Sequence, residues 1–219
     1  MIELKGIVKI YDKNVSDKPA LNNVNLTIDD GELVSVIGPS GSGKSTLLNI
    51  IGCMDRATEG QYILNGVDVY SCSRKKYDLL RKDNIGFVFQ HFALMDKFTA
   101  YENIELPLLA HNIKRTQRNR MINDAMERLG ILSEKGKMPS KMSGGQQQRV
   151  AIARALVTGC NILLADEPTG ALDQATGREV IRILKEINAS GTTVIIVTHD
   201  SGIAEQTNRI IEICDGELA

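Results

Sequence analysis

One short run of glycine and hydroxyl residues has the composition of a phosphate-binding loop. Residues 38–45 read GPSGSGKS and match the pattern G-x-x-x-x-G-K-[ST] in full. Glycines allow the backbone to wrap closely around phosphate groups and to aim several N–H groups at their oxygens. Lys44 would neutralise the β- and γ-phosphates of a nucleotide, and Ser45 would coordinate Mg²⁺. A flexible Gly/Ser turn is the weaker alternative, because this phosphate loop (residues 38–46) lies between a predicted strand and a predicted helix.

Two consecutive carboxylates follow an apolar run. The segment ILLAD at residues 162–166 ends in Asp166, and Glu167 and Pro168 come next. A strand end beside a phosphate loop can place one acid, Asp166, in the shell of Mg²⁺, while Glu167 polarises a water for attack on the γ-phosphate. The alternative is a pair of solvated surface carboxylates. The apolar run before the pair and the proline after it disfavour this alternative.

A second loop, KMSGGQQQR at residues 141–149, resembles the start of a helix that binds an anion. Its Ser-Gly-Gly run leads into Gln-rich and then Ala-rich residues, which predict a helix whose positive end would face the anion. From these residues alone, the second loop could serve another nucleotide, or the same nucleotide from elsewhere.

For three single residues, position in the sequence alone does not establish a functional role. Gln90 follows the apolar run at residues 85–89, and His199 closes the segment TTVIIVTHD. For His199, spacing favours a structural and a catalytic role equally. Tyr11 ends the first predicted strand, where an exposed aromatic ring either stacks on a base or packs against the protein.

The phosphate loop and the carboxylates require a sheet to position them. Continuous apolar runs are typical of strands buried on both faces, and they occur at residues 33–37, 85–89, 162–166, 193–198 and 209–213. Helical patterns separate them, after the phosphate loop and on the face formed by Val180, Ile183, Leu184 and Ile187. Strands that alternate with helices predict a largely parallel α/β sheet.

The remaining patterns predict a strand-rich beginning and a helical lobe. Alternation at Ile2, Leu4, Val8 and Ile10, and again at residues 24–28, predicts half-buried strands. YILNGVDVY predicts a hairpin with its turn at Asn65-Gly66. Beyond residue 91, TAYENIELPLLA predicts a helix broken near Pro107, and a second helical face is formed by Ile122, Ala125, Met126 and Leu129.

The composition restricts the classes of function. The 219 residues suffice for one large domain, and the formal net charge of −1 offers no whole-chain electrostatic basis for binding nucleic acid. No zinc spacing relates the scattered cysteines, so we expect reduced thiols, at Cys53, Cys72, Cys160 and Cys214. No charged and then apolar leader opens the chain, so we expect no signal peptide. The apolar runs fall short of the roughly 18 residues that span a bilayer. We therefore expect a cytosolic protein whose membrane role comes through a partner.

Taken together, the segments resemble the ATP-binding subunit of ABC transporters over essentially the whole chain. GPSGSGKST is similar to the Walker A motif, ILLADEP to Walker B, MSGGQ to the family signature, and GALD at residues 170–173 to the D-loop. Gln90 falls at the Q-loop, His199 at the switch histidine and Tyr11 at the adenine-stacking aromatic residue. Met142 departs from the usual Leu of the signature, but it is a flexible apolar residue of similar size, so we expect little effect.

Five longer segments are similar to one branch of that family, the MacB/LolD/FtsE branch: IGCMDRATEG, IGFVFQ, ENIELPL, MSGGQQQRVAIARAL and LLADEPTGALD. The branch serves lipoprotein release, macrolide or antimicrobial-peptide export, and cell-division control.

The resemblance implies a single ABC ATPase domain over residues 1–219. Its fold would be α/β, with a P-loop NTPase (RecA-like) core on a mainly parallel sheet, an N-terminal antiparallel β subdomain and a helical subdomain inserted at about residues 91–158. ATP and Mg²⁺ would be the cofactors. Glu167, His199, Lys44 and Gln90 would be catalytic, and Ser45, Gln90 and Asp166 would hold the metal. The implied nucleotide-binding residues are Tyr11, Gly38, Pro39, Ser40, Gly41, Ser42, Gly43, Lys44, Ser45, Thr46, Gln90, Ser143, Gly144, Gly145, Gln146, Asp173 and His199.

The resemblance also implies two protein partners and no nucleic acid. A second copy would pack head to tail, so that each ATP is sandwiched between the phosphate loop of one copy and the second loop of the other. A transmembrane permease subunit (MacB/FtsX-like) would hold the protein in the cytoplasm, peripheral to the inner face of the cell membrane. The surface formed by residues 92–95 and Phe98 would dock that permease, or would belong to the core of the helical lobe.

The implied function is an ATPase motor whose ATP-driven dimerisation powers a permease that exports or extracts a peptide, lipopeptide, lipoprotein or antibiotic. An FtsE-like regulatory ATP switch without transport is the alternative, and nothing in the chain separates the two. Chromosome-maintenance and translation-factor ATPases are disfavoured, since they carry a coiled-coil insertion or tandem ATPase domains. A small P-loop kinase would not need the second loop. The transported molecule, its direction and the permease are not encoded in these motifs.

Overall fold

A six-stranded sheet lies at the centre of the structure, a computed structural model that describes residues 1–11 and 18–219. The strand order is β10-β9-β3-β8-β7-β6, and neighbouring strands run parallel except at β10. The strands are β3 (Leu33–Ile37), β6 (Ile85–Val88), β7 (Ile162–Asp166), β8 (Thr193–Val197), β9 (Arg209–Cys214) and β10 (Glu217–Leu218). The mainly parallel sheet expected from the apolar runs is confirmed.

A separate antiparallel sheet has the order β2-β1-β4-β5. Its strands are β1 (Ile2–Lys9), β2 (Leu21–Ile28), β4 (Glu59–Leu64) and β5 (Val67–Asp68). The predicted hairpin turn is confirmed, because Leu64 pairs with Val67 and the turn residues Asn65 and Gly66 have φ values of 50° and 77°.

The predicted alternation along β1 is wrong beyond Leu4. The pairing register shifts between Leu4 and Ile7, so Ile7 is buried and Val8 is only half-buried. Gly6, with φ of 58°, lies inside this irregularity. A bulge reverses the side-chain alternation of a strand, so strict parity fails at this point.

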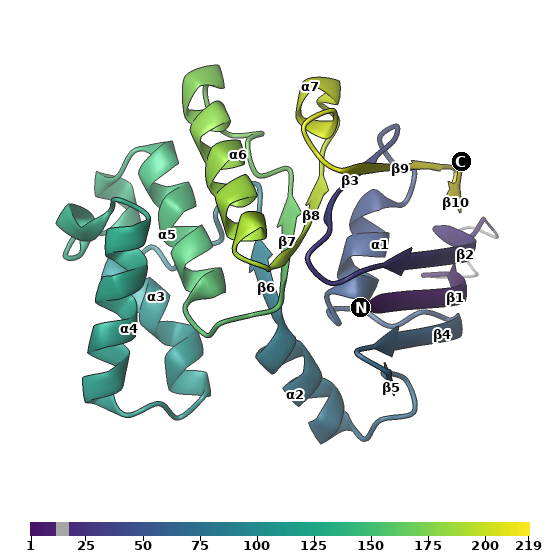
Figure 1. Cartoon of the computed structure of the whole chain (residues 1–219), viewed down its shortest axis with the longest axis horizontal. Coiled ribbons are helices and arrows are strands. Elements are labelled where there is room, and N and C mark those ends of the chain that lie inside the picture. The colour runs from purple at the N-terminus through teal and green to yellow at the C-terminus, as the bar shows by residue number, and fades with distance from the viewer. Residues whose placement is uncertain (12–17) are drawn as a thin grey trace.

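Helix α1 (Lys44–Ile51) packs between the two sheets, and the helices α3 (Ala100–Ala110), α4 (Arg115–Arg128), α5 (Gly144–Leu156) and α6 (Gln174–Ala189) lie on the opposite side of the parallel sheet (Figure 1). One buried cluster joins Leu47 and Ile51 of α1 to the antiparallel sheet and to one face of the parallel sheet. The other cluster joins the second face of the parallel sheet to α3, α4, α5 and α6. Helix α1, which begins at Lys44, is therefore fixed on two sides.

Helices α3, α4 and α5 lie side by side (Figure 1), and all three fall within the segment predicted as an inserted helical lobe. We propose residues 91–158 as the limits of this inserted helical subdomain. The predicted break near Pro107 is wrong, because α3 continues to Ala110 through the proline. Burial of Ile104 and Leu108 in the core holds this helix across the missing N–H donor.

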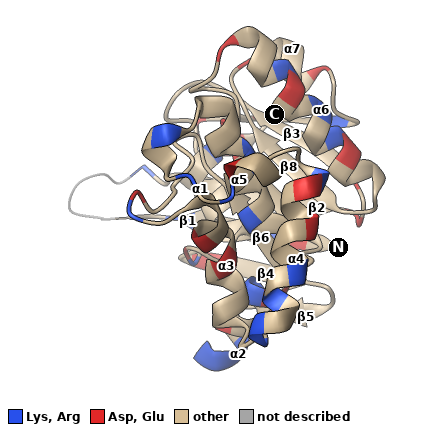
Figure 2. Ribbon diagram, turned by 90° about the vertical axis from the view of Figure 1, so that its left-hand side faces the viewer, with Lys and Arg blue, Asp and Glu red and all other residues tan. Residues whose placement is uncertain are grey.

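Two helices were not expected from the sequence. Helix α2 (Arg74–Asn84) is mostly charged and buries only Tyr77, so it has little apolar periodicity, and α7 (Ser201–Ala204) is a single turn. Basic and acidic residues are interspersed in the part of the chain that forms α3, α4 and α5, in keeping with the near-neutral net charge (Figure 2). Within residues 1–11 and 18–219, none of the helices is both long and apolar enough to cross a membrane.

Candidate functional site

The phosphate loop joins the end of β3 to the start of α1. A Cβ atom at Gly38 would lie 2.0 Å from the carbonyl oxygen of Ile213, and one at Gly43 would lie 2.5 Å from that of Ala20. Both glycines also have φ values, 150° and 107°, that side-chain-bearing residues rarely adopt. The fold therefore requires glycine at the two positions that the pattern fixes.

The loop opens onto a cavity of about 290 Å³. The Lys44 Nζ donates to the carbonyl oxygens of Gly38 and Pro39 at 2.8 and 2.7 Å, so its ammonium group lies folded over the loop. Strand β7 brings the two predicted carboxylates to the same cavity, whose lining residues are Ala20, Ser40, Gly41, Gly43, Lys44, Ser45, Thr46, Asp166, Glu167 and Val197. Residues that lie about 120 positions apart along the chain thus share one site, as expected where parallel strands end at one edge.

The first carboxylate, Asp166, carries a charge that its surroundings disfavour. Burial, followed by repulsion from the neighbouring Glu167 carboxylate, raises the pKa of Asp166, while Lys44 and Ser45 act in the opposite direction. A cation placed beside Asp166 would stabilise its charged form. Asp166 therefore has the chemistry of a metal ligand.

Glu167 and His199 contact each other directly. The His199 Nδ1 lies 2.8 Å from the Glu167 Oε1, and this hydrogen bond raises the pKa of His199. Glu167 has φ of 47°, a left-handed conformation, and its N–H donates to the Val197 carbonyl oxygen at 2.9 Å. This strained backbone at the end of β7 turns the Glu167 side chain toward His199 at the end of β8.

Tyr11 lies beside the start of α1, next to Thr46 at the end of the phosphate loop. Its ring is 62% exposed, and its hydroxyl lies 3.3 Å from the Thr46 Oγ1 on α1. The exposed ring is free to take part in stacking, and the hydroxyl contact keeps it beside the phosphate-loop helix. This arrangement supports the base-stacking hypothesis over the packing alternative.

The second loop forms the start of α5, as expected. Ser143 is the N-cap: its hydroxyl oxygen accepts from the Gln146 N–H at 3.3 Å, and the Gln146 Oε1 accepts from the Ser143 N–H at 2.8 Å. A Cβ at Gly145 would lie 2.5 Å from the Thr176 Cγ2 on α6. Asp173 caps α6 in turn, accepting from the Thr176 hydroxyl at 2.6 Å. The second loop and the D-loop segment are thus neighbours within one chain.

Gln90 lies against this same region. A Cβ at Gly170 would be 2.7 Å from the Gln90 Nε2, so the amide of Gln90 rests on the backbone three residues after Glu167. The structure therefore brings Ser45, Asp166, Glu167 and Lys44 together around the cavity. Gln90 approaches from the side of the helical segment, next to the turn that follows Glu167.

Three residues near the site were not expected to matter. Gln148 on α5 is fully buried and donates from its Nε2 to the Pro168 carbonyl oxygen at 2.8 Å, which ties the second-loop helix to the turn after Glu167. Lys9 and Asp55 pair beside Tyr11 at 2.8 Å. The only sequence signals are that Gln148 belongs to the Gln-rich run and that Lys9 precedes Tyr11 by two residues on one strand.

The residues fit a nucleotide with Mg²⁺. The buried Ser42 hydroxyl has no hydrogen-bond partner among the described residues, and it lies beneath Gly38 inside the loop. No group of three or more His, Cys, Asp or Glu that could hold a metal occurs within residues 1–11 and 18–219. Ser45 and Asp166 would therefore need phosphate oxygens to complete a metal site, which is how Mg²⁺ is usually held beside nucleotides.

Comparisons with known proteins point in the same direction. The sequence profile of the ABC transporter family matches residues 21–170. The macrolide export ATP-binding/permease protein MacB is 47% identical in Sodalis glossinidius and 46% identical in Escherichia coli, over 218 residues. These alignments take in 100% of this chain but 33% and 34% of the relatives, so the chain spans about a third of their length.

Solved structures match the fold closely. The ATP-binding cassette MJ0796, solved as a dimer in a post-hydrolysis state bound to ADP and Pi, superposes with a TM-score of 0.91 at 43% identity, covering 100% of this chain and 96% of that chain. cbiO1 from Clostridium perfringens, part of the transporter complex cbiONQ, superposes with a TM-score of 0.89 at 28% identity, covering 100% and 86%.

Proposed function

The chain belongs to the ABC transporter family, and from this we propose that it binds and hydrolyses ATP to drive a membrane permease. The observation that carries the proposal is the contact between His199 and Glu167, 2.8 Å from Nδ1 to Oε1, because Glu167 also lines the cavity of the phosphate loop. A carboxylate held by an imidazole beside a phosphate site suits the activation of water. The related cassette that was solved with ADP and Pi supports the same chemistry.

The charged residues of the cavity, together with Ser45, His199 and Gln90, have specific roles in this proposal. Lys44 would leave its own carbonyl partners to neutralise the β- and γ-phosphates, while backbone N–H groups of the loop bind phosphate oxygens. Ser45 and Asp166 would hold Mg²⁺, which when bound neutralises charge that develops on the phosphates. Glu167 would accept a proton from the attacking water at its carboxylate, and His199 would keep that carboxylate oriented. Gln90 would bring the helical segment into contact with the metal or the water.

The second loop would complete the site on another copy of the chain. In the proposed head-to-tail dimer, Ser143 and the first N–H groups of α5 bind the γ-phosphate held by the partner's phosphate loop. Hydrolysis of both ATP molecules would remove the two such contacts of the dimer and open it. Dimeric structures of the cassette MJ0796 support this assembly, and Asp173 would lie at the same interface.

A groove beside β6 is our candidate for the permease contact. It has a volume of about 430 Å³ and is lined by apolar side chains that include Phe87, Phe89 and Pro107, with Arg81 and Arg154 among the basic residues. Arg154 donates to the carbonyl oxygens of Phe92 and Ala93 at 3.0 and 2.5 Å. Leu94 packs on the core, whereas Met95 and Phe98 are exposed and would be available to the proposed permease contact.

We further propose the setting and the cargo class. The protein would act in the cytoplasm at the inner face of the cell membrane, bound to a permease that exports or extracts a peptide, lipopeptide, lipoprotein or antibiotic. Relatives named macrolide export ATP-binding/permease proteins support export over a purely regulatory switch. Purification of a tagged copy from membranes, followed by identification of the bound permease, tests this part.

Glu167→Gln tests the catalytic proposal. The variant keeps the shape of the side chain but loses the proton acceptor, so we expect ATP binding to persist and hydrolysis to fall by about 10²- to 10⁴-fold. Size-exclusion chromatography with light scattering should show an ATP- and Mg²⁺-dependent dimer. Glu127→Gln, at an exposed position on α4, is the matched control and should hydrolyse ATP normally. A Glu167→Gln variant with normal turnover would contradict the assigned role.

A further inference from the structure

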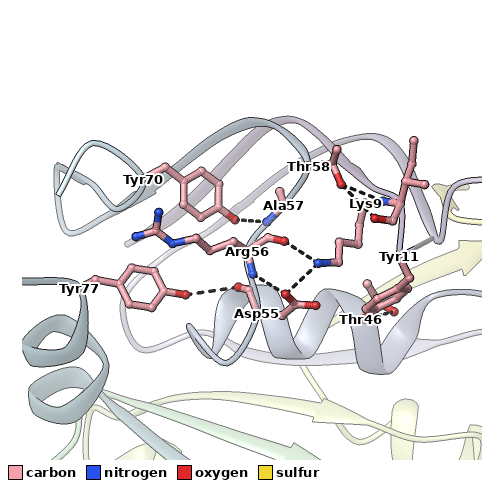
Figure 3. Close-up of polar contacts among 10 residues, drawn as sticks. Lys9, Tyr11, Thr46, Asp55, Arg56, Ala57, Thr58, Tyr70 and Tyr77 are labelled. Carbon is pink, nitrogen blue, oxygen red and sulfur yellow. Dashed lines mark hydrogen bonds and ion pairs between the residues drawn. The ribbon is translucent and has the colours of Figure 1, made fainter. Parts of the chain in front are cut away.

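Lys9 occupies an unusual position behind the ring of Tyr11. Its Nζ donates to the Asp55 Oδ1 and to the Arg56 carbonyl oxygen, both at 2.8 Å, and lies 4.7 Å from the centroid of the Tyr11 ring (Figure 3). The Lys9 side chain is only 11% exposed, although it is charged. An ammonium group held this way covers one face of the aromatic ring.

The partner of Lys9 belongs to a turn that follows α1. Asp55 also accepts from the Arg56 N–H at 2.7 Å, which shapes the turn around the ammonium group. Thr58 fastens the end of β1 to the same turn, because its hydroxyl oxygen accepts from the Ile10 N–H at 3.0 Å and its own N–H donates to the Val8 carbonyl oxygen at 2.8 Å. The backbone that leads to Tyr11 is therefore anchored to the C-terminal end of the phosphate-loop helix.

The other side of the turn is supported by two tyrosines. The Arg56 guanidinium lies 4.5 Å from the ring centroid of Tyr77 and 5.9 Å from that of Tyr70. The Tyr77 hydroxyl donates to the Asp55 carbonyl oxygen at 3.3 Å, and the Tyr70 hydroxyl accepts from the Ala57 N–H at 3.0 Å (Figure 3). The carboxylate that holds Lys9 thus belongs to a turn that these contacts hold rigid. An ordinary surface ion pair lacks such support.

The charges of this pair support each other. Burial of Asp55 works to raise its pKa, but hydrogen bonds from Lys9 and from the Arg56 N–H overcome that effect, so the pKa of Asp55 lies below its ordinary value. The Asp55 carboxylate is therefore charged near neutral pH and can hold the Lys9 ammonium group in place behind the ring.

We propose that Lys9, held by Asp55, is a positioning residue for the Tyr11 ring and so sets the affinity of the site for the nucleotide base. The inference rests on the proposed binding of ATP. Lys9 lies against one face of the Tyr11 ring and Thr46 lies beside its hydroxyl, so a base would stack on the face away from Lys9. An exposed ring that is already held in its stacking orientation loses less conformational freedom when the base binds.

The test compares a ligand with a base to one without. Calorimetric titration of the full chain with ADP and with inorganic pyrophosphate, both with Mg²⁺, separates base contacts from phosphate contacts and avoids hydrolysis. Lys9→Met should weaken ADP binding by about three- to tenfold and leave pyrophosphate binding unchanged. Lys5→Met, an exposed lysine on the same strand, is the matched control and should change neither.

A second comparison shows whether Lys9 acts through Tyr11. In a Tyr11→Ala background, Lys9→Met should cause no additional loss of ADP affinity. Equal losses in both backgrounds, or equal losses for ADP and pyrophosphate, would overturn the inference. Should Lys9→Met fold poorly because it leaves the Asp55 carboxylate unpaired, the double variant with Asp55→Asn removes both charges and should show the same loss specific to ADP. A wild-type chain that binds neither ADP nor ATP would instead refute the proposed function.

Discussion

Ser143 provides a way to separate the folding of the second loop from its contact with a second copy. Its hydroxyl oxygen accepts the Gln146 N–H to cap α5. Because the cap uses only a lone pair, the hydroxyl proton remains available to a phosphate oxygen. We consider the changes to Asp, Asn and Ala, since Asp and Asn cap helices about as well as Ser, whereas Ala does not.

The expected magnitudes differ for stability and for dimerisation. Ser143→Ala should cost about 0.5–2 kcal/mol from the lost cap and lower the melting temperature by about 2–4 °C per kcal/mol in a chain of this size. Ser143→Asp and Ser143→Asn should leave the melting temperature unchanged, because both residues can cap the helix. Two unit charges about 4 Å apart near a protein surface interact by about 4 kcal/mol. The carboxylate that Ser143→Asp places opposite a γ-phosphate would therefore weaken each contact about a thousandfold, and the closed dimer has two such contacts.

The assay uses the Glu167→Gln background, in which the closed dimer should accumulate. Light scattering across a range of protein concentrations gives the dimer constant with ATP and Mg²⁺, and thermal unfolding without nucleotide gives the stability. We expect the Ser143→Asp variant to remain monomeric and to melt with the parent, while the Ser143→Asn variant dimerises far better. If these two variants dimerise equally, Ser143 does not face the γ-phosphate and the sandwich mechanism fails.

Three other predictions follow from single contacts. Gly145→Ala should lower stability by about 1–3 kcal/mol through its clash with the Thr176 methyl group, and Thr176→Ser, which removes that methyl, should restore the melting temperature. Gln148→Leu should destabilise by about 1–3 kcal/mol in denaturant unfolding, because it leaves a buried carbonyl oxygen without its donor. NMR titration should place the pKa of His199 above 6.5, and Glu167→Gln should lower it toward that value, because the Glu167 hydrogen bond is the largest cause of the shift. The pair therefore stabilises the fold at pH values below about 6.5. This contribution is lost as the pH rises through the higher pKa of His199 in the folded state.

The Gly145 prediction changes how a signature-loop variant should be read. If Gly145 faced a second copy alone, a bulky residue at this position would report only on dimer closure. In the structure the added Cβ would first meet Thr176 of its own chain, and the Thr176 methyl can turn away only if its hydroxyl leaves Asp173. A loss of activity at Gly145 therefore reports packing inside one chain as well as any contact with a second chain.

The elements that hold the site were predictable because their signals are local. β3, β7 and β8 are continuous apolar runs buried on both faces, and a glycine loop between a strand and a helix has few alternatives. Helix α2 was missed because a charged helix that buries one side chain carries little periodicity. The break expected at Pro107 failed because tertiary burial outweighed a local preference.

The contacts that support the site could not be predicted in the same way. Lys9 and Asp55 are 46 positions apart, and Gln148 and Pro168 are 20 apart. Such pairs depend on how β1, α1 and α5 pack, which a single sequence does not specify. The resemblance to a known family named the residues proposed to contact the nucleotide, but it gave no information about the residues that hold those in place.

The backbone at the start of α5 gives an independent reason to expect a second copy. The first N–H groups of α5, those of Gly144 and Gly145, have no acceptor within the part of the chain that the structure describes, and the helix adds positive charge at this end. The cavity of the same chain is lined by the phosphate loop and the β7 carboxylates, and the second loop lies beside α6. In the proposed head-to-tail arrangement, the γ-phosphate held by a second copy would be the anion that these donors bind.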